Sequence, residues 1–160
     1  MGGSYRPRAY AKEAVGVIAA LLRQTEPDNF QKLLTDGLGY APSLAHADLQ
    51  RCNLQNAYLG VRADRAIDLS NADYFEADLS HASLRDARAR EAVFYGATLK
   101  GTVFDGSDLT RANFRGADLE GVRFGNAILT EARFEHAQHI PPEVSAQLQD
   151  GRVQHSPVGQ

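Results

Sequence analysis

The side chains most able to carry chemistry in this chain are a single cysteine and five histidines. A nucleophilic site needs a thiol or hydroxyl beside a base that a third group orients. Cys52 falls at a position that the spacing described below directs into the core, so we interpret it as a packing residue. The histidines are His46, His81, His136, His139 and His155. They occupy turn positions in different columns or lie near the C-terminus, so the sequence predicts no catalytic residues.

Metal and cofactor sites are equally hard to assemble from this sequence. The nearest approach to a ligand cluster is Glu135 with His136 and His139. Structural zinc sites use four ligands and catalytic zinc sites use three in fixed geometry, and we interpret these residues as surface groups. The chain has no G-x-G-x-x-G sequence and no phosphate-binding loop. We therefore expect no metal, no cofactor and no enzymatic activity.

The composition is that of a folded domain with balanced charge. The 160 residues are 43% hydrophobic and 23% charged, with a formal net charge of −3. These values do not indicate disorder, and they do not indicate the basic surface of a direct nucleic-acid binder. The longest apolar run, residues 14–22, is shorter than the roughly 20 residues of a membrane span. With one cysteine and no recognisable signal peptide, we expect a cytoplasmic protein without a membrane partner.

A repeat of five residues dominates the middle of the chain. Nineteen positions spaced by five run from Leu44 to Phe134, and seventeen of them are Leu, Phe or Tyr. Two residues before each of these centres, 12 of the 19 positions are Ala. The residue between is often Asp or Asn, as in Ala112-Asn113-Phe114. Neither a helix of period 3.6 nor a strand of period 2 gathers such positions on one face. A chain that turns a corner every five residues buries all of them.

The turns themselves have a composition that fits this geometry. Two residues after the centre, the repeat often carries Gly or Asn, which tolerate the backbone angles of tight turns. The glycines are Gly96, Gly101, Gly106, Gly116 and Gly121, and the asparagines are Asn56, Asn71 and Asn126. One large and one small residue of each unit then point inward, and a turn follows.

With this pattern, residues 42–140 resemble the pentapeptide-repeat family, whose units read Ala-(Asp/Asn)-Leu-X-X. The match extends over the whole range with no insertion or deletion. The resemblance implies an all-β solenoid, a right-handed quadrilateral β-helix with four units per coil and about five coils. Residues 20 apart then stack. Phe94, Phe114 and Phe134 form one column, and Phe104 and Phe124 form the opposite one.

Two units break the pattern. Arg62 and Asp64 occupy the small and the large inward positions of one unit, where buried charge is costly. We expect residues 60–66 to bulge out of the coil, or Arg62 and Asp64 to pair with each other. Ala89 replaces a large centre and predicts a slack spot or a small cavity.

The two ends have different composition from the repeat. Residues 1–41 contain an amphipathic helix whose apolar face includes Tyr10, Ile18, Leu21 and Leu22. A second short helix is predicted from Asp28 to Gly37. These helices either cover the N-terminal edge of the solenoid or dock a partner or a second copy. In residues 141–160, we expect one or two helical turns from Glu143 and a polar, flexible tail from Gln149.

The outward columns offer candidate binding faces. One column reads Gln55, Phe75, Tyr95, Arg115 and Glu135. Exposed aromatic rings beside an arginine are typical of binding interfaces, although the rings could equally cover each other. A second column, Glu91, Arg111 and Glu131, predicts a solvated charge ladder. The most acidic side contains Asp78, Asp118 and Glu120, with Lys100 between them.

These features favour a protein-interaction or scaffolding module whose partner is another protein, with a homodimer through a terminal segment as a further option. The family resemblance implies an alternative, since some pentapeptide-repeat proteins imitate duplex DNA and bind DNA gyrase, protecting it from inhibitors. Those proteins resemble DNA in charge as well as shape. Here residues 42–140 carry 14 acidic and 11 basic side chains. Arginines interrupt any array that could imitate phosphates, which weighs against the DNA-mimic interpretation.

Overall fold

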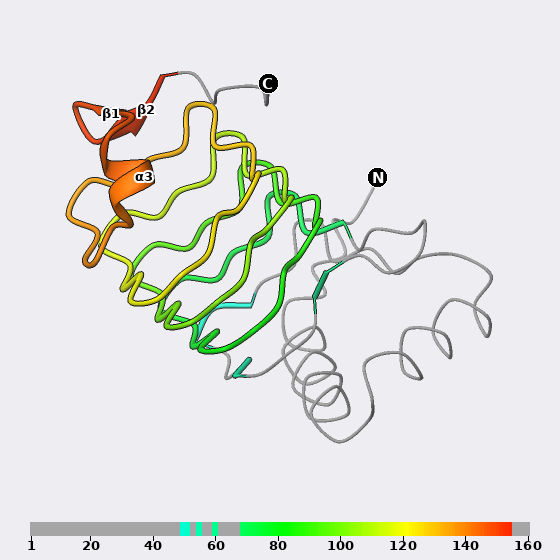
Figure 1. Ribbon diagram of the computed structural model, residues 1–160. Helices are drawn as coiled ribbons and strands as arrows, with labels where there is room; N and C mark the ends of the chain where they lie inside the picture. The colour runs from blue at the N-terminus through cyan, green and yellow to red at the C-terminus, as the bar shows by residue number, and fades with distance from the viewer. Residues whose placement is uncertain (1–48, 52–53, 56–58, 61–67, 155–160) are drawn as a thin grey trace, which may run out of the picture.

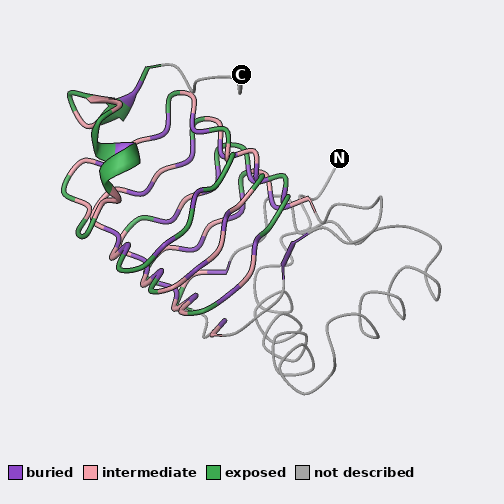
Figure 2. Ribbon diagram, viewed as in Figure 1, coloured by how far each residue is buried: buried purple, intermediate pink, exposed green. Residues whose placement is uncertain are grey.

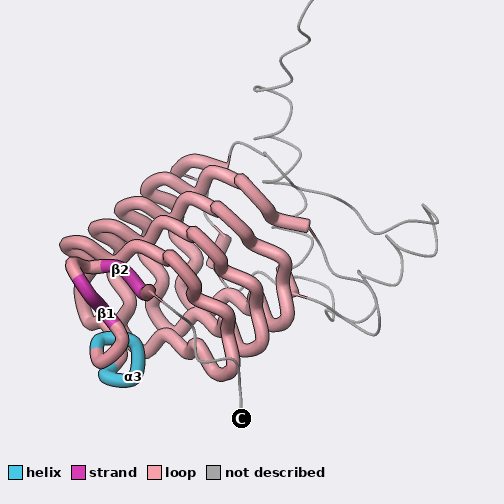
Figure 3. The backbone as a smooth tube through the Cα atoms, turned by 90° about the horizontal axis from the view of Figure 1, so that it is seen from above, coloured by secondary structure: helices cyan, strands magenta, loops and turns pink. Residues whose placement is uncertain are grey.

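The chain winds into a stack of coils around a continuous core (Figures 1 and 3). The computed structural model describes residues 49–51, 54–55, 59–60 and 68–154. Parallel β-bridges join residues 20 apart, from Asp68↔Arg88 to Asp118↔Gln138. Four units of five residues therefore make one coil, as predicted. Each side of a coil contributes a single bridge rather than a strand, so the solenoid is all-β with very short sides. The number of coils stays a prediction.

Hydrogen bonds between successive coils hold the stack together. Up to Leu119, the amide of each described centre donates to the carbonyl of the residue that immediately precedes the stacked centre of the next coil. Examples are Phe94 to Asn113 at 2.8 Å and Phe104 to Arg123 at 2.7 Å. Within the units, the Asp or Asn before the centre caps the following turn. The Asp73 Oδ1 accepts the Phe75 amide at 3.0 Å. These acidic and amide side chains therefore have a structural role, because they satisfy turn amides that no other backbone group reaches.

The predicted left-handed turns occur, and they extend beyond Gly and Asn. Asn71 has φ of 58° and Gly96 has φ of 66°, but Glu76 and Arg111 also take positive values of 51° and 61°. A left-handed non-glycine residue costs roughly 1–2 kcal/mol. The Glu76 amide donates to the Tyr95 carbonyl at 3.0 Å. Such inter-coil bonds recur at the described turns up to Gly116 and offset the strain, so side chains of many types are accepted there.

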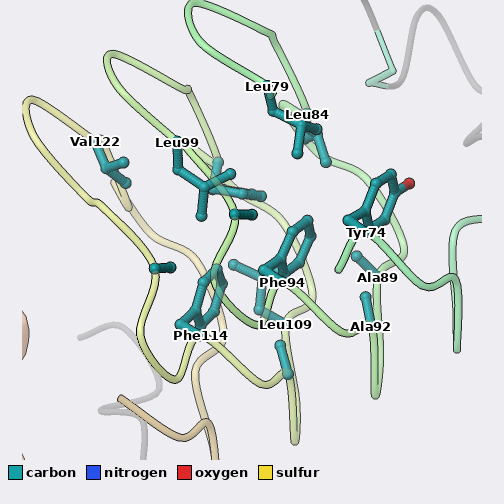
Figure 4. Close-up of a cluster of buried hydrophobic side chains, with 14 of the residues drawn as sticks. Tyr74, Leu79, Leu84, Ala89, Ala92, Phe94, Leu99, Leu109, Phe114 and Val122 are labelled. Atoms are coloured by element: carbon teal, nitrogen blue, oxygen red, sulfur yellow. The ribbon is translucent and has the colours of Figure 1, made fainter. Parts of the chain in front are cut away.

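The inward positions form the core, as the repeat predicted (Figure 2). Phe114 stacks on Phe94 and on Phe134 with ring centroids 5.0 Å apart in both pairs. Phe104 stacks on Phe124 at 5.4 Å, and rings of the two columns meet edge to face across the core. The close-up in Figure 4 shows Phe94 and Phe114 aligned in one column. The predicted stacking of like on like is confirmed for these columns.

Tyr74 begins the first of these columns and, within the described residues, is the one core residue whose side-chain polar atom has no hydrogen-bond partner. Its ring stacks on Phe94 at 4.9 Å, and its side chain is fully buried. The hydroxyl has no hydrogen-bond partner, and burial raises the pKa of Tyr74 well above its ordinary value. A buried hydroxyl without a partner destabilises the folded state, because water solvates it when the chain unfolds.

We expect Tyr74→Phe to stabilise the protein. The change keeps the ring stack and removes the stranded hydroxyl, so the free energy of unfolding should rise by about 1 kcal/mol, within the range for an unsatisfied buried group. Chemical denaturation measures it. Tyr95→Phe is the control, since that ring is exposed and its hydroxyl is not stranded in the core. A loss of stability in Tyr74→Phe would show that the hydroxyl has a partner after all.

The register of the ladder changes before Leu69, which corrects the expectation of an uninterrupted repeat. Leu59 donates to the Ser83 carbonyl, whereas Leu69 donates to Arg88. Between Leu59 and Leu69 the chain advances by two units, but between their partners it advances by only one. The stretch between Leu59 and Leu69 therefore contains one more unit of five residues than the coil it stacks on. The unit with charged residues at its inward positions falls in this interval. Residues 61–67, with Arg62 and Asp64, lie outside the described residues.

Gly60 lies where the register changes. A Cβ atom at this position would overlap the backbone carbonyl oxygen of Arg85, and would lie 2.9 Å from the Arg85 amide nitrogen. Only glycine lets the first coil approach the second this closely. Ala89, on the other side of the register change, is fully buried and donates to Asp108 at 2.9 Å; the slack spot beside it stays a prediction.

The C-terminal end differs from the flexible tail that we expected from Gln149. A short helix, α3 (Pro142–Ser145), follows Pro141. It leads to an antiparallel hairpin of β1 (Leu148–Gln149) and β2 (Arg152–Val153). β2 pairs antiparallel with the last coil through Arg133↔Arg152, and Val153 is fully buried. The hairpin lies at the end of the stack (Figure 1). There its carbonyl groups accept hydrogen bonds from amides of the last coil, in the place that a further coil would take.

The predicted N-terminal helices, with Tyr10, Ile18, Leu21 and Leu22, lie outside the described residues. So do Cys52, His46 and His155. Among the helices of the described ranges, none is long and apolar enough to span a membrane.

Candidate functional site

An outward column of aromatic and charged side chains runs along one side of the solenoid. Phe75 and Tyr95 each follow a buried aromatic centre, so they project outward from the same side of successive coils. Their rings stack with centroids 5.7 Å apart and planes 14° apart. The Arg115 guanidinium lies 5.9 Å from the centre of the Tyr95 ring, and Glu135 follows at 3.7 Å from Arg115. Four of the five residues that the sequence placed in one column are thus together.

Gln55 does not belong to this column: the register places Gln50 after the stacked centre, and the side chain of Arg51, one residue later, covers the Phe75 ring. The Arg51 guanidinium lies 5.8 Å from the centre of the Phe75 ring and pairs with Glu76 at 2.9 Å. Gln55 instead donates to Asp78 on the next side, at 2.5 Å. The surplus unit before Leu69 shifts the first coil by one side. The sequence-based assignment counted in steps of 20 and could not detect this shift.

The aromatic column, defined as Arg51, Phe75, Tyr95, Arg115 and Glu135, is both packed and accessible. Arginine groups cover the outer faces of the two rings, and the rings cover each other, which is the alternative raised by the sequence. Tyr95 nevertheless remains 42% exposed, while Phe75 is half-buried. An ordered aromatic ring that presents an edge and a hydroxyl to solvent loses little entropy on binding.

Arg115 keeps unused hydrogen-bonding capacity. Its Nε and the Glu135 Oε2 are buried from solvent, and neither has a hydrogen-bond partner; the 3.7 Å between them is an ion pair only. Partial burial alone would raise the pKa of Glu135, but hydrogen bonds from its own backbone and from Arg133, with the charges of Arg133 and Arg115, lower it below its ordinary value. Glu135 therefore stays ionised and holds Arg115 in place over Tyr95.

The acidic side is closer to neutral than its sequence suggested. Lys100 contacts Asp118 at 3.4 Å and Glu120 at 2.9 Å. The Nδ1 of His139 lies 2.9 Å from the Asp118 carboxylate. Asp78 caps the turn at Ser80 and accepts from Gln55. Desolvation alone would raise the pKa of Asp118, but hydrogen bonds from His139 and Glu120, with the charge of Lys100, lower it below its ordinary value.

The remaining two sides carry alternating charges. Arg111 pairs with Glu131 at 2.8 Å and approaches Glu91 at 3.9 Å, which is the predicted charge ladder. Asp105 lies between two arginines of neighbouring coils, 3.1 Å from Arg85 and 2.7 Å from Arg123. Each side of the described solenoid thus presents both signs of charge. Exposed pairs of this kind add little stability, but they set which partners fit.

The histidines in the described part of the chain lie on the surface of the solenoid. His81 and His136 lie in exposed turns, and His139 pairs with Asp118. Over residues 49–51, 54–55, 59–60 and 68–154, no group of three His, Cys, Asp or Glu side chains could hold a metal ion.

Comparison with known proteins supports the same view of the repeat. A family model of pentapeptide repeats matches residues 75–111 and 107–138, in 8 copies. A solved pentapeptide repeat protein from Nostoc Pcc 7120 is 26% identical, with 74% of this chain and 92% of that chain covered and a TM-score of 0.53. No curated protein sequence matches this chain.

Two further solved structures are less similar. HetL, a pentapeptide repeat protein involved in heterocyst differentiation regulation in the cyanobacterium Nostoc sp. strain PCC 7120, is 28% identical over 70% of this chain and 53% of that chain, with a TM-score of 0.37. QnrB1, a plasmid-mediated fluoroquinolone resistance protein, is 20% identical over 61% of this chain and 57% of that chain, with a TM-score of 0.27.

Proposed function

Because this chain belongs to the pentapeptide-repeat family, we propose that it is a non-enzymatic protein-interaction module whose aromatic column contacts another protein. The observation that carries this proposal is the stack of Phe75 on Tyr95 at 5.7 Å, between two arginine groups. Aromatic and arginine side chains held in one geometry are the usual anchors of protein interfaces. The solenoid keeps them in register through its inter-coil hydrogen bonds, so the surface is preorganised.

The accessible groups indicate what the partner offers. Tyr95 presents a ring edge and a hydroxyl, and the Arg115 side chain beside it is 36% exposed. A partner with a carboxylate next to an apolar side chain would fit both groups, since guanidinium binds carboxylate in a planar arrangement. The contact would bury a small, mixed surface at the centre of a larger interface.

The alternative, a DNA mimic that binds gyrase, calls for a continuous negative stripe along one side. Lys100 lies between the carboxylates of the acidic side, and Asp105 lies between Arg85 and Arg123. These alternating charges favour the scaffold over the mimic. Gyrase binding remains one of the outcomes that the following experiment distinguishes.

The test is affinity capture from a lysate of the source organism, read by quantitative mass spectrometry, with wild type and Phe75→Ala/Tyr95→Ala as baits. A partner anchored on the aromatic column should be lost at least about 30-fold, the equivalent of roughly 2 kcal/mol for a central anchor. Tyr95→Phe should retain it in large part, because the ring stack persists. Ile128→Ala is the matched control, since Ile128 is 45% exposed and is not part of the column.

Each outcome has a defined meaning. Loss with the double variant and retention with Ile128→Ala supports the proposal. Equal recovery with all baits would mean that the column only packs against itself, and the proposal for this face would fail. Enrichment of gyrase subunits would revive the DNA-mimic alternative, and a supercoiling assay with and without the protein would then decide it.

A further inference from the structure

The last coil has an edge that the C-terminal hairpin leaves open. One coil earlier, the equivalent side is fully paired: the Thr102 carbonyl accepts from Arg123 at 3.0 Å, and the Phe104 amide donates to Arg123 at 2.7 Å. The corresponding Val122 carbonyl and the amides of Phe124 and Asn126 have no hydrogen-bond partner within the part of the chain that the structure describes. The Val122 carbonyl and the Phe124 amide have the spacing of one parallel β-bridge, and the Asn126 amide is that of the turn that follows.

A hollow lies beside this edge. It has a volume of about 230 Å³ and lies between the last coil and α3, with Phe124, Leu129 and Val144 among its apolar lining residues. This volume accommodates a large apolar side chain with its backbone, and it is below the roughly 300–1,000 Å³ of sites for drug-sized ligands. Glu143 is the only ionisable residue of the lining, and it is exposed on the first turn of α3.

The opposite side of the same coil already holds an extended segment. β2 pairs there, with Glu131 donating to Val153 at 2.8 Å and Phe134 to Gly151 at 2.7 Å. The last coil therefore accepts an added strand on one side, and the open groups at residues 122–126 offer an equivalent edge on the opposite side. We propose that the open edge at residues 122–126 binds an extended peptide of a partner protein by strand addition.

The shape of this end favours a slender peptide over a second solenoid. α3 and the hairpin stand beyond the last coil (Figures 1 and 3), so the flat end of another coil cannot come within hydrogen-bond distance of Phe124. A single peptide enters beside α3. One five-residue side also buries far less than the roughly 1,200 Å² of a stable protein interface. Binding here is weak by itself and serves as one contact of a larger assembly.

The pleat of the solenoid determines the chemistry of the peptide. The residue that forms the bridge points outward, and the residues before and after it point toward the core. The peptide that fits the open edge therefore has three residues in sequence: a small apolar residue, a basic residue and a large apolar residue. The basic side chain pairs with Glu143, and the large side chain enters the hollow beside Phe124. The chain's own Val122-Arg123-Phe124 has this pattern and pairs in this way with the coil before it.

The probe is a fluorescein-labelled peptide, Gly-Val-Arg-Phe-Gly-Asn, with fluorescence anisotropy as the readout. We expect saturable binding, together with slower hydrogen exchange at the Phe124 and Asn126 amides in NMR spectra. The same peptide methylated on its arginine amide cannot donate to the Val122 carbonyl, and it should bind at least about fivefold more weakly. Glu143→Lys should weaken binding of the arginine peptide. The variant should bind a peptide with glutamate in place of the arginine more tightly than the wild-type protein does.

Two results would overturn this proposal outright: no saturable binding, or binding that N-methylation and Glu143→Lys leave unchanged. Protection of the Phe124 and Asn126 amides in the free protein would also overturn it. If that protection grew with protein concentration, a second copy would be the occupant; if it disappeared in a variant ending at Gln154, the chain's own C-terminal residues would be. Phe75→Ala/Tyr95→Ala should bind the peptide as wild type does, so this test is independent of the proposed function.

Discussion

Phe114→Asp should unfold the solenoid locally, in the coils that pack against residue 114. The Phe114 ring is fully buried, stacks on Phe94 and Phe134 at 5.0 Å, and meets Phe104 and Phe124 edge to face. Removing such a ring costs about 3–5 kcal/mol, and an unpaired carboxylate in the same place adds several more. The sum approaches the total stability of a small domain, about 5–15 kcal/mol.

The measurement is thermal and chemical denaturation followed by circular dichroism, with hydrogen exchange to locate the damage. Because each coil contacts only its neighbours, amides of the coils next to Phe114 should lose protection first. Phe114→Leu is the matched control and should remain folded with a smaller loss, since leucine already fills the alternate columns. A melting curve of Phe114→Asp that superimposes on wild type would show that the ring does not lie where the repeat places it.

The second large effect is expected at Gly60. Gly60→Ala places a methyl group against the Arg85 carbonyl oxygen and 2.9 Å from the Arg85 nitrogen. Backbone atoms of the second coil cannot move aside without breaking the ladder, so the first coil must separate from it. We expect a loss of several kcal/mol of unfolding free energy, comparable to severe overpacking of a core. The amides of Leu54 and Leu59, which donate across this junction, should exchange much faster.

Gly116→Ala is the control that separates contact from conformation. Gly116 has φ of +67°, and a Cβ atom there would come no closer than 3.9 Å to the preceding coil. The expected loss is about 1–2 kcal/mol, the cost of a left-handed alanine, measured by denaturation as for Gly60→Ala. Equal effects of the two substitutions would mean that Gly60 serves only as a flexible turn residue, and the close approach of the first two coils would be refuted.

These stabilities bear on function because the solenoid positions its outward residues through its inward ones. Tyr95 follows Phe94, and Arg115 follows Phe114, so each layer of the core fixes one layer of the aromatic column. Binding of the partner proposed for this column should therefore fall in Phe114→Asp even though Phe114 is buried. Tyr74→Phe, by contrast, should leave binding unchanged while it stabilises the fold.

The sequence alone determined the repeat, the inward residues and the stacking of like on like. A period of five over many units admits one way to bury the large positions together, and this local rule needs no tertiary information. The outward position of Phe75 and Tyr95 follows from it, and the phenylalanine columns and the cation over Tyr95 follow once four units make a coil, as the family resemblance implies. The unit with Arg62 and Asp64 was also recognisable as an exception, because charge at two inward positions contradicts the rule.

Only the tertiary structure decided where the register changes and how the end is closed. A surplus of one unit leaves the spacing of five intact, so the sequence pattern continues through it. The shift becomes visible only in the partners of Leu59 and Leu69, which are Ser83 and Arg88. That shift brings Arg51, not Gln55, to the aromatic column. The pairing of β2 with the last coil was likewise hidden, because a strand of two residues, Arg152–Val153, carries no periodicity of its own and forms only where an open edge supplies its hydrogen-bond partners.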